Sequence, residues 1–131
     1  MSFREEFTQK VQERFRKELK GKLALDTVQE EIREGLGILY ADLQQYVDNG
    51  VGIDIDTTVY REGIFSRVTI AEDTLLFKRE GKGINVFLNN EEIDLLWFNS
   101  VGVFSNHFDQ KFSTPMLSEY LKQAFRKTLG L

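Results

Sequence analysis

Two aspartates, Asp54 and Asp56, are the side chains of this 131-residue sequence whose spacing is most suggestive of chemistry. They alternate with apolar residues, and this alternation predicts a strand that places both carboxylates on one face, about 7 Å apart. Such a pair could bracket a cation or divide acid and base roles. However, Val59 and Phe65 stand where an EF-hand loop that begins at Asp54 would carry glycine and glutamate. We therefore interpret the two aspartates as the solvated face of an edge strand.

His107 and Asp109 form a second candidate pair, in a segment, residues 99–113, that has no clear apolar period. A carboxylate can orient an imidazole, and nearby serines could supply a hydroxyl group. The nucleophile-elbow pattern is absent, because Phe98 stands where a glycine would have to precede Ser100. One histidine and no cysteine leave no zinc or iron–sulfur ligand set. We therefore predict no catalytic residue, no metal site and no cofactor, and the sequence favours a binding protein over an enzyme.

Two basic features of the sequence could contact phosphate groups. The turn at residues 80–83, Glu-Gly-Lys-Gly, resembles a phosphate-binding loop in composition, but it lacks the spacing of a P-loop and predicts a hairpin turn. Five basic residues near the N-terminus are interrupted by glutamates; they are Arg14, Arg16, Lys17, Lys20 and Lys22. Because the net charge is −4, the sequence disfavours nucleic acid as a partner, and we interpret this cluster as a solvated helix flank.

Aromatic side chains could line a ligand pocket or anchor an interface. The candidate residues for an apolar pocket are Phe87, Trp97, Phe104, Phe108 and His107. Three phenylalanines at four-residue spacing, Phe104, Phe108 and Phe112, are also candidates for a protein interface. Plain core packing is the alternative for all of these aromatic side chains.

The apolar spacing predicts two N-terminal helices. In the first, an apolar residue recurs every fourth position, at Phe3, Phe7, Val11, Phe15, Leu19 and Leu23. We expect this helix to end at Gly21. A second helix is expected to begin at a cap, Asp26 or Thr27, and to end at Asn49-Gly50.

Beyond residue 50 the apolar period changes from 3.6 to 2, which predicts strands. They are expected within residues 51–60, 64–70, 75–79, 84–88 and 93–98, with a possible short strand at 101–105. The connections are too short for crossover helices, so neighbouring strands should pair antiparallel. A C-terminal helix is expected from Pro115, capped by Thr114, to Gly130. The sequence thus predicts a single α+β domain, residues 1–131, with two N-terminal helices, an antiparallel meander of four or five strands and a C-terminal helix in two packed layers.

Charge is divided unevenly along the chain. Residues 1–22 carry seven basic and four acidic side chains, whereas residues 23–60 carry one basic and eight acidic side chains. This division is compatible with head-to-tail self-association, or with a basic element that lies beside an acidic one. No stretch reaches the roughly 18 apolar residues of a membrane span, and the first residues do not form a secretory signal. We therefore expect no membrane span and a cytoplasmic location.

With no catalytic signature, the favoured function is a noncatalytic binding or protein-interaction module. We expect it to self-associate as a dimer or other homo-oligomer, or to bind another protein, through a helix face or through residues 101–112. The alternative is a pocket protein for an apolar small molecule, either a carrier or a small enzyme, with its cavity between the helices and a curved sheet.

Overall fold

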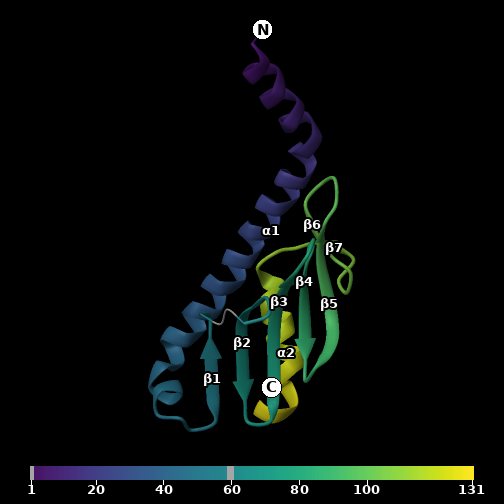
Figure 1. Ribbon diagram of the computed structural model, residues 1–131. Helices are drawn as coiled ribbons and strands as arrows, with labels where there is room; N and C mark the ends of the chain where they lie inside the picture. The colour runs from purple at the N-terminus through teal and green to yellow at the C-terminus, as the bar shows by residue number, and fades with distance from the viewer. Residues whose placement is uncertain (1, 59–60) are drawn as a thin grey trace.

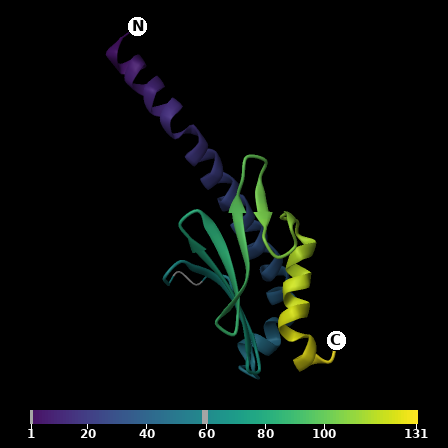
Figure 2. The same ribbon diagram turned by 90° about the vertical axis from the view of Figure 1, so that its right-hand side faces the viewer.

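Two helices and seven strands make up the part of the chain that the computed structural model describes, residues 2–58 and 61–131. In chain order these elements are α1 (Phe3–Asp48), β1 (Ile53–Asp56), β2 (Ile64–Ile70), β3 (Asp73–Glu80), β4 (Gly83–Leu88), β5 (Glu91–Phe98), β6 (Val103–Ser105), β7 (Gln110–Lys111) and α2 (Pro115–Leu129). Each strand pairs antiparallel with the next, so the sheet is a meander from β1 to β7. Both helices lie on the same side of the sheet (Figures 1 and 2). The predicted α+β class, antiparallel sheet and C-terminal helix are confirmed.

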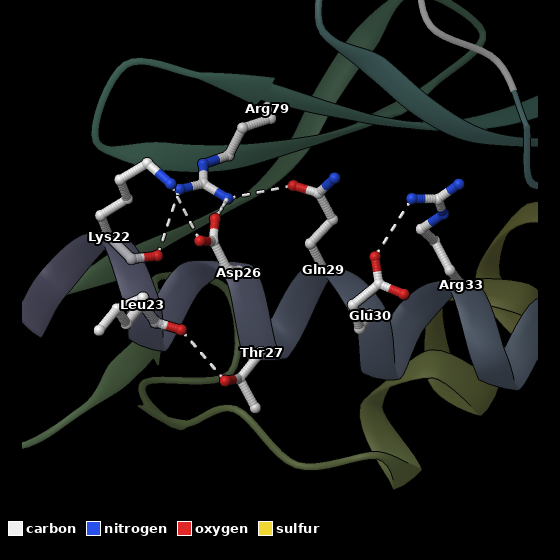
Figure 3. Close-up of polar contacts among 8 residues, drawn as sticks. All are labelled: Lys22, Leu23, Asp26, Thr27, Gln29, Glu30, Arg33 and Arg79. Atoms are coloured by element: carbon white, nitrogen blue, oxygen red, sulfur yellow. Dashed lines mark hydrogen bonds and ion pairs between the residues drawn. The ribbon is translucent and has the colours of Figure 1, made fainter.

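The prediction of two N-terminal helices is wrong, because α1 runs without interruption for 46 residues. Gly21 does not end a helix. It is buried within α1, where a Cβ atom would lie 3.0 Å from Cδ1 of Phe98, so the glycine permits a close approach of helix and sheet. Asp26 and Thr27 do not cap a second helix either, since the Thr27 hydroxyl donates to the Leu23 carbonyl of the preceding turn at 3.1 Å (Figure 3).

The sheet has more strands than the four or five predicted. β6 and β7 form a hairpin within residues 99–113, where only the possible strand at 101–105 was expected. A two-residue strand such as β7 is too short to show a period, which explains why the sequence did not predict it. β1 is shorter than the predicted strand at 51–60, and the part of that prediction that covers residues 59–60 lies outside the described residues.

The strand register divides the side chains of the sheet between two faces. Partners such as Val68 with Leu75, and Phe77 with Val86, point toward the helices and are buried. The core comprises these side chains together with others from both helices and the sheet, including Leu25, Ile32, Leu36, Ile55, Ile84, Leu96, Tyr120 and Phe125. No described helix covers the opposite face of the sheet (Figure 2).

The two helices end as their local sequences predict. α1 stops at Asp48, and the backbone N–H groups of Asn49 and Gly50 both donate to the Val47 carbonyl. α2 begins at Pro115, although the Thr114 side chain makes no capping hydrogen bond, and it ends at Gly130 in a left-handed conformation, with φ of 70°. Such a conformation suits glycine because it has no Cβ atom.

Candidate functional site

The N-terminal half of α1 projects past the end of the sheet (Figures 1 and 2). We call residues 3–23 the arm. No residue from 3 to 20 is buried. The helix is nevertheless well formed locally, because Ser2 accepts a hydrogen bond from the Glu5 backbone N–H and Glu5 and Glu6 lie at the positive end of the helix dipole.

The arm displays six apolar side chains to solvent, and we call this set the stripe. Their exposed fractions range from 41% for Val11 to 79% for Phe3; the six are Phe3, Phe7, Val11, Phe15, Leu19 and Leu23. Each step of four residues advances about 40° around a helix, so the two ends of the stripe lie on nearly opposite sides of α1. Leu23 thus points away from the sheet, whereas Leu25, two residues later, is buried in the core. The stripe therefore crosses the core-facing side of the helix obliquely: Phe7 lies 18 residues, or five turns, before the buried Leu25 and shares its side, whereas Leu19 and Leu23 do not.

Arg79 of β3 fixes the point at which α1 meets the sheet (Figure 3). Its Nη1 atom donates to Asp26 Oδ1 and to Gln29 Oε1, each at 3.0 Å, and its Nη2 atom donates to the Lys22 carbonyl at 3.5 Å. Lys22 Nζ donates to the other oxygen of Asp26 at 3.0 Å. The pKa of Asp26 is below its usual value, mainly because of the hydrogen bond from Lys22. Burial is the next largest effect and raises the pKa, and the hydrogen bond from Arg79 lowers it further. The Asp26 carboxylate therefore links two cations at the base of the arm.

A cavity of about 620 Å³ opens beside this cluster, between α1, the β3–β4 turn and the end of β5. Its apolar wall is formed by the buried Leu25 and the half-buried Phe98. Its polar lining includes five basic residues and one acidic residue, namely Lys17, Lys20, Lys22, Arg79, Lys82 and Glu18. Within the described residues, no carboxylate lies within ion-pair distance of Lys17, Lys20 or Lys82. The residues that line the cavity therefore carry an excess of positive charge, although the whole protein is acidic.

Three of the predicted pocket residues, Phe87, Trp97 and Phe104, lie on the sheet face opposite the helices. Trp97 pairs with Phe104 across β5 and β6, and their rings meet edge to face at 6.2 Å. Phe87 lies on the same face, paired with Leu76. Trp97 also donates its ring N–H to Asn106 at 2.7 Å. Trp97 and Phe104 thus form a partly exposed aromatic pair, whereas Phe87 lies four residues along β4 from Gly83, the partner of Trp97.

The other predicted pocket and interface residues lie nearer to α2. Phe108 packs against the core, with its ring 5.6 Å from that of Tyr120. His107 is exposed and its ring lies 4.7 Å from the ring of Phe108. Phe112 is buried in the core. The structure thus does not bring the five predicted pocket residues together, and it covers one of the three predicted interface residues.

Asp94 is a buried polar residue that the sequence analysis did not predict as part of a site. One of its oxygens accepts the backbone N–H groups of Leu95 and His107, and the other accepts the hydroxyl groups of Ser105 and Tyr120. These bonds join β5, β6 and α2, which gives Asp94 a structural role. Burial, and then the hydrogen bond to Asp94, raise the pKa of Tyr120 well above its usual value of 10.0. A charged residue two positions before the core residue Leu96 was the signal in the sequence, because alternate strand residues share a face.

The candidate carboxylates Asp54 and Asp56 do lie on one face of β1, where both form ion pairs with Arg67 of β2. The distances from Arg67 Nη2 are 3.2 Å to Asp54 and 3.9 Å to Asp56. Asp56 also accepts hydrogen bonds from the backbone N–H and the hydroxyl of Thr58. Local partners therefore account for both side chains without a bound cation.

Comparisons with protein-family models, curated proteins and solved structures gave no match to this chain. Across residues 2–58 and 61–131, no cluster of three or more histidine, cysteine, aspartate or glutamate side chains could hold a metal ion. Neither of the described helices is both long enough and apolar enough to cross a bilayer. The arm and the cavity at its base are the candidate functional features of the described residues.

Proposed function

We propose that the protein is a noncatalytic, cytoplasmic interaction module that self-associates through the stripe on its arm. The observation that carries this proposal is the exposure of six large apolar side chains on a helix that projects from the rest of the protein. Exposed apolar patches on a single chain rarely exceed a few hundred Å², and larger ones mark interaction sites. The exposed fractions of the stripe correspond to roughly 600 Å² on each copy. A partner would remove this surface from water.

A second copy of this chain fits the stripe in size. Two stripes in contact could bury at most roughly 1,200 Å², because only the central part of each stripe faces the partner; even this upper limit lies at the lower limit for a specific interface, so the flanking polar side chains must also contribute. In an antiparallel pair centred near residue 13, Phe7 of one copy faces Leu19 of the other and Val11 faces Phe15. Each contact then places a larger side chain opposite a smaller one. The arrangement is closed and symmetric, as in most homodimers.

The charges of the arm are also complementary in this arrangement. Glu5 and Glu6 lie near its start, and Lys20 and Lys22 lie near its end. An antiparallel pair brings the acidic end of each arm close to the basic end of the other. Because exposed ion pairs stabilise weakly, these charges would set the orientation and contribute little affinity.

The stripe further determines how the two arms would cross. A uniform four-residue spacing differs from the alternating three and four of a coiled coil, so two arms cannot stay in register over a long parallel path. Rows of side chains spaced four apart interdigitate when helices cross at about −50°. We therefore expect a crossed pair centred on Val11 and Phe15, with Phe3 and Leu23 at the edges of the contact.

The two routes to self-association that the sequence left open are not equally supported. Phe112 is buried and Phe108 packs against the core, so residues 101–112 offer less free aromatic surface than their sequence suggests. The alternative function, an apolar pocket between helices and sheet, also has less support, because Phe87, Trp97 and Phe104 lie on the uncovered face. The helix face is therefore the preferred interaction surface.

Sedimentation over a range of concentrations tests the proposal. We expect the unmodified protein to dimerise at high micromolar concentration and Phe15→Glu to remain monomeric, because a charge would be buried at the centre of the crossing. Gln9→Glu is the matched control, since it adds the same charge about 120° around the helix from Phe15 and about 160° from Val11, and it should still dimerise. Circular dichroism should show equal helix content in both variants. An unmodified protein that stays monomeric throughout, or equal dimerisation of Phe15→Glu and Gln9→Glu, contradicts the proposal.

A further variant separates the helix face from the aromatic segment. Val101→Glu places a charge on an exposed residue of segment 101–112, which is 80% exposed. We expect it to dimerise like the unmodified protein. Loss of the dimer in Val101→Glu, with the dimer retained in Phe15→Glu, would transfer the interface to that segment.

A further inference from the structure

We propose that the cavity at the base of the arm binds a small organic phosphate, with several negative charges on its phosphate part and a flat, apolar body. None of the stripe residues lines the cavity, although Lys20 and Lys22, which would face the acidic end of the other arm in the proposed dimer, do. The inference rests on the charge of the lining, the shape and size of the cavity, and the one aromatic side chain on its wall.

The charge of the lining points to an anion with more than one negative charge. Five basic side chains and one acidic side chain line the cavity, which gives a formal excess of four positive charges. Asp26, beside the cavity, forms ion pairs with Lys22 and Arg79 and reduces this excess to three. Cations gathered in one concavity repel one another, and a bound polyanion would relieve that repulsion. Phosphate groups are frequent partners of lysine and arginine.

The cations come from segments far apart in the sequence, which argues that the site is built by the fold. Lys17 and Lys20 belong to α1, Arg79 to β3, and Lys82 to the β3–β4 turn. The turn also presents the backbone of Gly81, with φ of 50°; a Cβ atom there would meet open space out to 4 Å, so a ligand can approach the main chain. Arg79 is held in place by Asp26 and Gln29, and this part of the site is therefore preorganised.

The apolar wall points to a flat body attached to the phosphate. Phe98 is half-buried, and its ring packs on Gly21, where even a methyl group would be crowded. The ring therefore lies against α1 beside the basic residues, and an aromatic ring of a ligand could stack on its exposed part. A cavity of about 620 Å³ is within the usual size range for small-molecule sites. Nucleoside polyphosphates have this combination of charge, size and flat ring.

Calorimetric titration of the full-length protein at low salt, without divalent metal ions, tests the site with three probes: ATP, inorganic triphosphate and adenosine. We expect one ATP to bind per chain. Triphosphate should bind about tenfold more weakly because it lacks the stacking contribution of a base, which is worth about that factor or more. Adenosine should bind more weakly still, because it carries no charge. Absence of heat with both ATP and triphosphate at millimolar concentration overturns the proposal.

Two double variants test whether the cavity is the binding site. Lys20→Gln with Lys82→Gln should lower the affinity for ATP at least about tenfold, since two charge-assisted contacts are lost. Lys10→Gln with Lys122→Gln removes the same charge from exposed positions outside the cavity and should leave the affinity nearly unchanged. Equal losses in the two variants would mean that ATP responds only to overall charge, and would overturn the site.

Phe98→Leu tests the apolar wall separately. Leucine keeps the position apolar but removes the aromatic face, so the affinity for ATP should fall while that for triphosphate is retained. Equal losses for the two probes would contradict a stacked body. Competition with a single-stranded oligonucleotide provides a further test: displacement of ATP by an oligonucleotide that binds more tightly would assign the cations to nucleic acid and overturn the small-molecule proposal.

Discussion

The two halves of α1 have the same backbone structure but opposite surroundings. In the arm, apolar residues recur every four positions and are exposed; in the second half, Leu25, Val28, Ile32 and Leu36 are buried against the sheet. The buried residues are spaced by three and four, so they fall within about 80° of one side of the helix. The stripe instead moves around the arm. The local sequence can therefore specify a helix along its whole length. Its apolar side chains are buried only where they face a second layer of structure, here the sheet.

Two contacts with the sheet lie where the two halves of α1 meet. Gly21 allows the helix to touch Phe98, and Arg79 joins the next turn to β3. The arm therefore leaves the sheet from a fixed point. This arrangement leaves the stripe exposed to solvent, with the cavity beside its base.

The largest expected effect comes from truncating one leucine in each half. Leu36→Ala should lower the free energy of unfolding by about 2–5 kcal/mol, because Leu36 is fully buried and leaves a cavity. Leu19→Ala should change it by less than about 0.5 kcal/mol in the monomer, because Leu19 is exposed. Urea unfolding at low protein concentration measures both values. Similar losses in the two variants would mean that the arm is packed against the rest of the chain, contrary to the structure.

Tyr120 should make the stability of the packed region depend on pH in the alkaline range. Tyr120→Phe should cost about 1.5–3 kcal/mol at neutral pH, because Asp94 loses a donor in a buried site. Because the pKa of Tyr120 is raised in the folded protein, its hydroxyl contributes fully to the free energy of unfolding at pH values below 10.0, the usual pKa of tyrosine. Above that pH the unfolded chain releases the proton first, and stability falls as pH rises. Unfolding measured from pH 8 to 11 should show a steeper decline in the unmodified protein than in Tyr120→Phe; parallel curves would contradict this.

Two glycines in the buried half of α1 should respond differently to alanine. Gly37 has open space around it, so Gly37→Ala should stabilise the protein by about 1 kcal/mol through helix propensity. At Gly35 a Cβ atom would lie 2.5 Å from Leu117 Cδ2, so repacking against α2 should offset that gain. We expect Gly35→Ala to be at least about 1 kcal/mol less stable than Gly37→Ala. Thermal unfolding can rank the two variants, and the reverse order would argue against close packing of the helices.

The smallest effect is expected at the base of the arm. Arg79→Gln should cost less than about 1 kcal/mol, because the ion pair with Asp26 is partly exposed and screened. Since the pKa of Asp26 is lowered in the folded protein, the ion pair should contribute to stability above pH 3.8, the usual pKa of aspartate. The contribution should disappear as the pH falls through the lowered pKa. Amide hydrogen exchange should show faster exchange near residues 22–26 in the variant at neutral pH. Unchanged exchange there would mean that Arg79 does not secure the arm.

The candidate sites were less predictable than the strands. Alternation identified β2 to β5 because each has one buried face, but it could not show that Phe87 and Trp97 lie on the uncovered face while Phe108 packs on the other side. Which face of a strand is buried depends on where the helices dock, and residues far apart in sequence decide that. The same limitation hid the cavity: the sequence showed Lys17 and Lys82 as two separate basic features, interpreted as a solvated helix flank and a hairpin turn, and only the fold brings them together beside Phe98.

The sequence by itself determined the helical character of both ends, the antiparallel meander and the ends at Asn49 and Gly130, because apolar period and turn residues act over a few neighbours. Only the tertiary structure decided that Gly21 lies inside a continuous helix, that Asp26 and Thr27 do not cap one, and that the stripe has no layer to cover it. A glycine permits either a helix end or a close contact, and Phe98, 77 positions later in the chain, supplies the contact that decides between them.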